Sequence, residues 1–244
     1  MPDTTAAPPA VTRKRWAVLA ALALAGACQA AVPAPIDAYA QMAPLDRYLI
    51  GQRGTEIALA RSAGPPAVSA GATVLVLGPH GYETAVAGRN GFTCLVERSW
   101  MNPFDNPEFW NPKLRGPVCY NAAASRSVLP YTIYRTKLVL DGTAKTPLLE
   151  QIRAAVAAKE LTAPEIGAMS YMMSKNQYLS DAYHAWHSHL MFYLPKTDSA
   201  GWGADLPGSP VLVDTSHTEV PEPQTIFMVA VGKWSDGTAA PMHH

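Results

Sequence analysis

The chain has 244 residues, with 19 basic and 19 acidic side chains and a formal net charge of zero. This balance excludes the strongly basic surface that binding to nucleic acid or to an anionic membrane would require. Hydrophobic residues make up 48% of the sequence, which is enough for one core of ordinary size, so we expect a single domain rather than two.

The amino-terminal segment predicts export. Arg13-Lys14-Arg15 precede an apolar run from Trp16 to Ala27, and small residues follow. The run is too short to cross a bilayer, which needs about 20 apolar residues, and it is typical of a signal peptide. We therefore assign residues 1–27 to a signal peptide and expect a protein of the periplasm or outer envelope without a membrane-spanning helix.

Cys28 leaves the processing of this segment open. Leu24-Ala25-Gly26-Ala27-Cys28 resembles the lipobox of bacterial lipoproteins, although Ala25 stands where that pattern prefers leucine. Plain cleavage after Ala27, or within residues 30–33, also fits the small side chains present there. A lipid on Cys28 would be the one membrane contact that we expect.

Composition divides the mature chain into a linker, a folded domain and a tail. Residues 28–44 are rich in Ala and Pro, as expected for a linker. We place one folded domain at residues 45–236 and a short tail at residues 237–244.

The cysteine count predicts one disulfide. The chain has three cysteines, and Cys94 and Cys119 remain as a pair once Cys28 is lipidated or removed. An oxidising compartment allows them to join, which would close a loop of about 25 residues and stabilise the fold by about 3 kcal/mol. Two buried thiols are the alternative.

In the first half of the domain, apolar spacing predicts a helix from residue 44 to residue 60. Three β-prone runs follow, at residues 72–77, 82–87 and 92–97. Asn90-Gly91 favours a tight hairpin turn, so we expect these strands to form an antiparallel meander.

The second half mixes loops, strands and helices. Prolines exclude regular structure from residues 100–117. Alternating polar and apolar residues predict a strand at 127–140, and Thr146-Pro147 predicts the start of a helix that continues to Lys159. A capping-box pattern at 162–165 predicts another helix through Met169, Met172 and Met173, whose methionines fill the core or, as an alternative, bind copper.

The segment from Asp181 to Pro195 carries the clearest chemical signal, because three of the seven histidines lie within six residues. If residues 187–194 form a strand, His187 and His189 share one face about 7 Å apart, a distance at which both can bind one metal. His184, Asp181, His217 or Glu219 would complete the site or orient an imidazole. The candidate ions are zinc, copper, iron and manganese, and the alternative is a polar sheet face without metal.

Other reaction signatures are missing from the sequence, including a nucleophile elbow, a phosphate-binding glycine loop and a dinucleotide fingerprint. Three segments, Gly91–Arg98, Met169–Ser174 and His187–Pro195, are similar to those of a group of exported bacterial proteins whose activity is uncharacterised. The resemblance covers roughly residues 45–232. It implies secretion and a shared fold, and it transfers no activity.

The sequence therefore predicts an α+β domain, in which an antiparallel sheet ending at residues 225–231 packs against two or three helices. Two functions follow. The first is a binding or envelope-associated module with no chemistry of its own and an unidentified small-molecule or protein partner. The second is a metal-dependent enzyme that uses the histidine segment.

Overall fold

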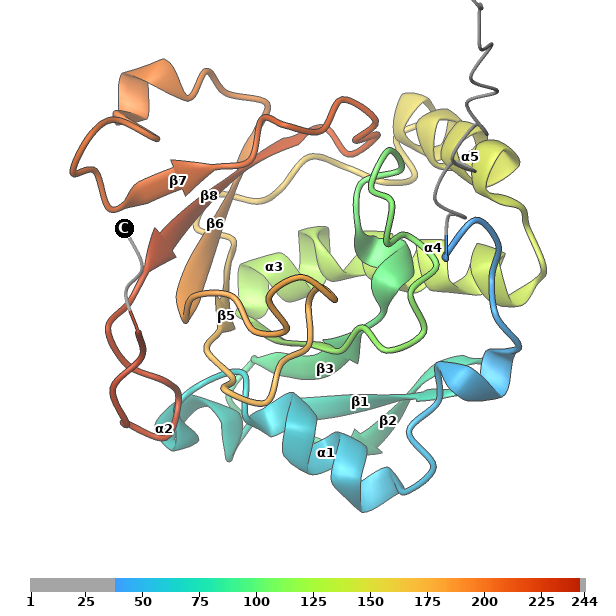
Figure 1. Ribbon diagram of the computed structural model, residues 1–244, viewed down its shortest axis with the longest axis horizontal. Coiled ribbons are helices and arrows are strands. Elements are labelled where there is room, and N and C mark those ends of the chain that lie inside the picture. Colours follow the sequence, from blue (N-terminus) through green and yellow to red (C-terminus); the bar gives the residue numbers. More distant parts are fainter. Residues whose placement is uncertain (1–37, 242–244) are drawn as a thin grey trace, which may run out of the picture. The chain divides into compact units, whose positions relative to one another are not determined.

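The computed structural model describes residues 38–241, which fall within one compact unit. The predicted signal peptide and Cys28 lie outside the described residues. A single eight-stranded sheet has the strand order β2-β1-β3-β4-β5-β6-β8-β7 (Figure 1). The strands are β1 (Thr73–Gly78), β2 (Gly81–Val86), β3 (Thr93–Glu97), β4 (Gly116–Tyr120), β5 (Met169–Met172), β6 (His189–Pro195), β7 (Val211–Val213) and β8 (Gln224–Ala230). The predicted α+β class is confirmed.

Helices cover both faces of the sheet. Figure 1 shows α1 and α2 on one side of β1 and β3, and α3 and α4 on the other side. The helices are η1 (Leu45–Arg47), α1 (Arg53–Arg61), α2 (Pro66–Ser69), η2 (Ser99–Met101), α3 (Ala122–Ser127), α4 (Leu129–Leu140), α5 (Lys145–Ala157) and η3 (Ala200–Trp202). None of the helices within residues 38–241 has the length and apolar character needed to span a membrane.

The first three strands do not form the predicted meander. Strands β1 and β2 form the expected antiparallel hairpin, but β3 pairs with the other edge of β1 and runs parallel to it. The return from β2 passes close to the start of β1. At Gly88 an added Cβ would lie only 2.0 Å from the backbone nitrogen of Thr73, so only glycine fits there.

The strand predicted at residues 127–140 is wrong, because this segment forms the end of α3 and all of α4. Asn121 caps α3 by accepting a hydrogen bond from the backbone nitrogen of Ala124, and Pro130 lies in the first turn of α4. Buried residues of α4 recur every three or four positions, which is the helical period. They are Leu129, Tyr131, Thr132, Arg135, Thr136 and Val139. The β-branched and aromatic residues suggested a strand, but packing on the sheet favours the helix.

Two other helix predictions are corrected. The helix expected from residue 44 is interrupted, since η1 ends at Arg47 and α1 begins at Arg53. The helix expected from residue 162 is instead a turn followed by strand β5. Gly167 in that turn has a φ of 80°, and β5 is held by pairing with β4 and β6, which overrides the local helical pattern. The helix predicted from residue 146 is confirmed as α5.

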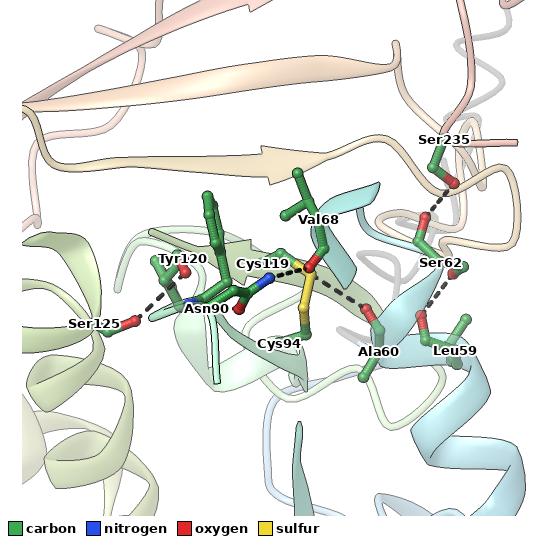
Figure 2. The surroundings of a disulfide bond; sticks show 11 residues. Leu59, Ala60, Ser62, Val68, Asn90, Cys94, Cys119, Tyr120, Ser125 and Ser235 are labelled. Atoms are coloured by element: carbon green, nitrogen blue, oxygen red, sulfur yellow. Dashed lines mark hydrogen bonds between the residues drawn. A yellow bond between two sulfur atoms is a disulfide. The ribbon is translucent and has the colours of Figure 1, made fainter. Parts of the chain in front are cut away.

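The disulfide is present and lies beneath helix α1. Cys94 and Cys119 are bonded and are direct partners across β3 and β4. Both are fully buried in an apolar cluster with Ala60, Ala63 and Val96. Figure 2 shows Cys119 beside the carbonyl of Ala60, near the end of α1.

A buried ion pair adds a second link between α1 and the sheet. The guanidinium of Arg98 donates to the Glu56 carboxylate at 2.8 Å, to the Tyr48 carbonyl at 2.7 Å, and to the carbonyl of Val96. Glu56 also accepts from the backbone nitrogen of Leu77 at 3.1 Å. Glu56 and Arg98 are both shielded from water, so each depends on these partners.

Side-chain and backbone contacts occupy part of each of the two edge strands. Arg53 donates to the carbonyl of Thr84 on β2 and pairs with Glu83. On β7, the backbone nitrogen of Asp205 donates to the carbonyl of Val211, and its carboxylate accepts from the nitrogen of Val213. These contacts occupy groups that would otherwise accept another strand.

Candidate functional site

The strongest candidate site centres on Glu97 at the end of β3, on the sheet face that packs against α4. The hydroxyl of Tyr120 on β4 donates to Glu97 Oε1 at 2.6 Å, and the hydroxyl of Thr132 on α4 donates to the same oxygen at 3.1 Å. Both bonds end on Oε1, so they leave the lone pairs of Oε2 available. Tyr120 and Thr132 are buried, whereas Glu97 keeps partial contact with solvent.

Opposing influences act on the pKa of this carboxyl. Burial raises the pKa of Glu97, although the two hydroxyl donors and the positive charge of Arg135 act in the opposite direction. The negative charge of Glu222 raises the pKa further. Burial also raises the pKa of Tyr120, so this hydroxyl remains a donor over the whole physiological range. A carboxyl whose pKa is raised by burial is a candidate functional group.

Arg135 on α4 lies close to this carboxyl and is itself incompletely bonded. Its guanidinium donates to the carbonyls of Trp100 and Asn102 at 2.9 and 3.0 Å and to Glu222 at 2.6 Å. It also stacks over the Phe104 ring, with its central carbon 4.6 Å from the ring centre. Arg135 Nε is buried without a hydrogen-bond partner. An orphan donor of this kind needs an explanation, which a water or a ligand would supply.

Hydroxyl groups extend the polar surface across the next two strands. Tyr193 on β6 and Ser170 on β5 are hydrogen-bonded through their hydroxyls at 2.9 Å, and both are buried. The Tyr193 ring lies 6.1 Å from the Tyr120 ring. The hydroxyls of four elements, β4, β5, β6 and α4, therefore lie on the same side of the sheet as Glu97.

The residues of this site carry no sequence motif that predicts them. In the sequence, Glu97 is simply the last residue of a β-prone run. Thr132 and Arg135 lie in the segment predicted as a strand, which forms α4. The usable signal was the alternation along β3, which puts Glu97 on the same face as the core residue Leu95.

The histidine segment leads into β6, which begins at His189 rather than at residue 187 as predicted. His189 is buried on β6, with its ring centre 4.7 Å from that of Trp186. His187 precedes the strand and lies 5.1 Å from the same indole ring. His184 is exposed, has a φ of 54°, and stacks on Tyr178 at 4.8 Å. The structure thus brings two of the three histidines to one aromatic side chain.

One ring nitrogen of His189 is engaged in a hydrogen bond. Its Nδ1 lies 2.7 Å from the carbonyl oxygen of His187, and because a carbonyl only accepts, Nδ1 carries the proton. Burial lowers the pKa of His189 to about 4, so the ring is neutral at pH 7. The unprotonated Nε2 is then able to act as a base or a metal ligand.

His217 lies between Asp105 of another loop and Asp214 of its own segment. Its Nδ1 lies 2.8 Å from an oxygen of Asp105, and its Nε2 lies 3.9 Å from an oxygen of Asp214. Glu219, the neighbouring candidate, accepts a bond from the nitrogen of Phe104 through its backbone carbonyl. Nowhere in residues 38–241 do three His, Cys, Asp or Glu side chains converge so that they could hold a metal ion.

Asp181 fixes the loop that carries His184. Its carboxylate accepts bonds from the hydroxyls of Tyr39 and Tyr178 at 2.6 and 2.7 Å, from Lys113 at 2.9 Å, and from the side chain of Asn111 at 3.0 Å. The bond from Tyr39 and those from Lys113 and Tyr178 hold the pKa of Asp181 well below its usual range. Its oxygens are engaged by these donors, so Asp181 anchors the loop.

Two surface depressions lie elsewhere. One, of about 450 Å³, is lined by residues 42–45 together with Val139, Leu140 and Gly142. The other, of about 480 Å³, is lined mainly by residues of α4 and by Leu161. Their linings are largely apolar and include neither Glu97 nor any histidine.

Comparison with protein-family models, with curated proteins and with solved structures found no match to this chain. The resemblance to exported bacterial proteins stays a prediction.

Proposed function

We propose that this is an exported binding protein that holds a small polar ligand against Glu97. One observation carries the proposal: the carboxyl of Glu97, whose pKa is raised by burial, has one oxygen bonded by two hydroxyls and the other available. Burying a carboxyl in this way costs stability unless a partner compensates for it. A bound ligand would be such a partner. Export rests on the basic and apolar residues of the amino-terminal segment.

The chemistry of the site limits the ligand. Glu97 Oε2 accepts from a hydroxyl or an amine, and Arg135 Nε would donate to a ligand oxygen that reached it. A sugar or polyol offers both a donor for Glu97 and an oxygen that accepts from Arg135, whereas an amine offers only the donor. Tyr120 and Tyr193 add ring surface and hydroxyls from neighbouring strands. We therefore favour a neutral ligand rich in hydroxyl groups.

Thermal unfolding in the presence of a panel of sugars, polyols and amines tests this proposal. A ligand from one class should raise the midpoint for the wild type and leave Glu97→Gln unchanged, because the amide offers donors where the ligand needs an acceptor. Glu160→Gln, at an exposed position, is the matched control and should respond like the wild type. An equal response of Glu97→Gln and the wild type would overturn the assignment to Glu97.

A second candidate is a metal-dependent enzyme that uses the histidine segment. It is favoured by the shared contact of His187 and His189 with Trp186 and by the unprotonated Nε2 of His189. His184 and His217 contact other residues, so further ligands would have to be water or substrate. The ion would be zinc, copper, iron or manganese, and it would polarise a bound water or substrate.

Elemental analysis separates the two candidates. Near-stoichiometric metal in the purified wild type, lost in the double variant His187→Ala/His189→Ala, would favour the enzyme. Metal missing from both, even after incubation with each of the four ions, would leave the binding protein.

A further inference from the structure

The sheet face that lies beneath α1 continues past this helix onto β6 and β8. Helix α1 packs on β1, β3 and β4. Cross-strand partners carry the same face onward, since Cys119 on β4 is opposite Tyr171 on β5, which is opposite Leu190 on β6. Phe192 lies two residues after Leu190 and is opposite Phe227 on β8, so both rings are on this face.

An exposed apolar surface lies on this part of the face. Trp202, in the loop between β6 and β7 that is drawn in orange in Figure 1, stacks on Phe227 with ring centres 4.7 Å apart and planes 24° apart. Phe227 is buried, whereas Trp202 is 48% exposed, so the indole covers Phe227 with one face and meets solvent with the other. Phe192 and Leu206 are also exposed. We call Phe192, Trp202 and Leu206 the Trp202 surface; exposed apolar groups gathered in this way mark an interaction site.

Acidic side chains flank the Trp202 surface. From residue 196 to residue 216 the chain carries three acidic residues and one basic residue, a net charge of −2 (one minus three), whereas the whole chain is neutral. The four residues, all exposed, are Lys196, Asp198, Asp205 and Asp214. The Asp205 carboxylate accepts from the backbone nitrogen of Val213, the residue opposite Phe227, at 3.2 Å. Asp205 therefore lies at the outer edge of β7, beside the strand that carries Phe227.

We propose that the Trp202 surface binds a basic peptide that also carries apolar side chains. The face of an indole attracts a cation, most often a guanidinium, and carboxylates beside it add opposite charge. The apolar side chains of the peptide would cover Phe192 and Leu206. The local negative charge disfavours an anionic membrane surface, and a second copy of the chain would bring the same acidic residues together.

This surface is on the opposite face of the sheet from Glu97, so the proposal goes beyond the ligand proposed there. The ordinary role of Trp202 would be to shield Phe227 from water. That role predicts no preference for a basic peptide over a neutral one of the same apolar content.

Fluorescence anisotropy of two short labelled peptides tests the proposal, one made of arginine and leucine and the other of serine and leucine. The protein should bind the arginine peptide about tenfold more tightly than the serine peptide, and added salt should weaken this binding. Trp202→Ala should weaken it about tenfold. Asp198→Asn/Asp205→Asn should weaken it about fivefold, and it keeps the oxygens that accept from the backbone nitrogens of Ala200 and Val213.

Matched controls remove similar groups elsewhere. Ile166→Ala removes an apolar side chain that is 99% exposed, and Asp141→Asn/Glu160→Gln removes two exposed negative charges. Both should bind the arginine peptide like the parent. Thermal unfolding checks that each variant folds, and the asparagine variant carries the test if Trp202→Ala does not fold.

Three results would overturn the proposal: no binding of the arginine peptide, equal binding of the two peptides, or unchanged affinity in Asp198→Asn/Asp205→Asn. Binding to vesicles of anionic lipid, or a dimer that Trp202→Ala dissociates, would also overturn it and assign the surface to a membrane or to a second copy. Glu97→Gln should bind the arginine peptide like the parent, so that failure of this surface and failure of the Glu97 site are distinguishable.

Discussion

The two faces of the sheet are built differently. The face beneath α1 holds the disulfide, small apolar side chains and the Arg98–Glu56 pair, in which the charged groups have bonded partners. The opposite face, toward α3 and α4, carries Glu97 with one oxygen available and Arg135 with an unbonded nitrogen. Satisfied groups stabilise a fold, whereas groups left open lower its stability unless something binds them. Because Arg61 Nε on α1 is also buried without a hydrogen-bond partner and Arg135 is paired with Glu222, the two faces differ chiefly at Glu97, which we assign to binding.

The largest expected effect comes from breaking the ion pair on the α1 face. Glu56→Ala leaves the buried guanidinium of Arg98 without its carboxylate, and we expect a loss of about 3–5 kcal/mol in the free energy of unfolding. Urea denaturation measures this loss. The exposed pair of Arg153 and Glu150 is the control, and Glu150→Ala should cost at most about 1 kcal/mol. Similar losses for both variants would contradict the role given to the buried pair.

The next effect concerns the disulfide. Cys94→Ala/Cys119→Ala removes a crosslink between residues separated by 25 positions, which the chain-entropy model values at about 3 kcal/mol. Denaturant unfolding of the wild type with and without reductant should show a loss of similar size. Ligand binding by the folded double variant should remain, since neither cysteine lies on the face of Glu97. Loss of binding in the folded variant would mean that the two faces are coupled.

His189 should make the free energy of unfolding depend on pH. Its folded-state pKa of about 4 lies below the value of about 6.5 expected for the unfolded chain, so the folded state takes up the proton less readily. This contribution to stability is present above pH 6.5 and is lost as the pH falls toward 4, by up to about 3 kcal/mol. Urea unfolding between pH 7 and pH 4 should show a smaller fall in His189→Gln than in the wild type. Equal slopes would contradict the buried, neutral state of this ring.

The smallest expected effect is a gain in stability at pH 7, and it comes from substitution of Glu97. Burial raises the folded-state pKa of Glu97, so its contribution to stability is present below the pKa of the unfolded chain and is lost as the pH rises through the folded-state value. Glu97→Gln keeps an acceptor for Tyr120 and has no charge to bury. We expect this variant to be more stable than the wild type at pH 7 and to lose that advantage at pH 4. A destabilised variant whose deficit is independent of pH would assign Glu97 a purely structural role.

Local signals in the sequence were enough for some elements. The β1–β2 hairpin, α5, β6, β8 and the disulfide follow from turn residues, apolar periodicity and cysteine parity. Segment 127–140 was misassigned because Tyr, Thr, Ile and Val favour strands locally, while the helix depends on burial against distant strands. For β5 the local pattern predicts a helix, whereas the observed strand depends on pairing with segments about 20 to 50 residues away.

The candidate site was harder to predict than the fold. The histidine segment drew notice because its residues are close in sequence, yet His184 and His217 contact other side chains. Glu97, Tyr120, Thr132 and Tyr193 are far apart in the chain and meet only because four strands and α4 bring them together.

The position of the disulfide has a consequence for folding. Cys94 and Cys119 are directly opposed on β3 and β4, and a slip of one residue would turn one of them to the other face of the sheet. Formation of the disulfide therefore requires that β3 and β4 are paired in the native register. Trapping free thiols at successive times during refolding would date that event relative to the change in tryptophan fluorescence, to which the buried Trp100 and Trp110 of the separate core cluster contribute. In an exported chain, the same bond would make the correct alignment hard to undo after folding.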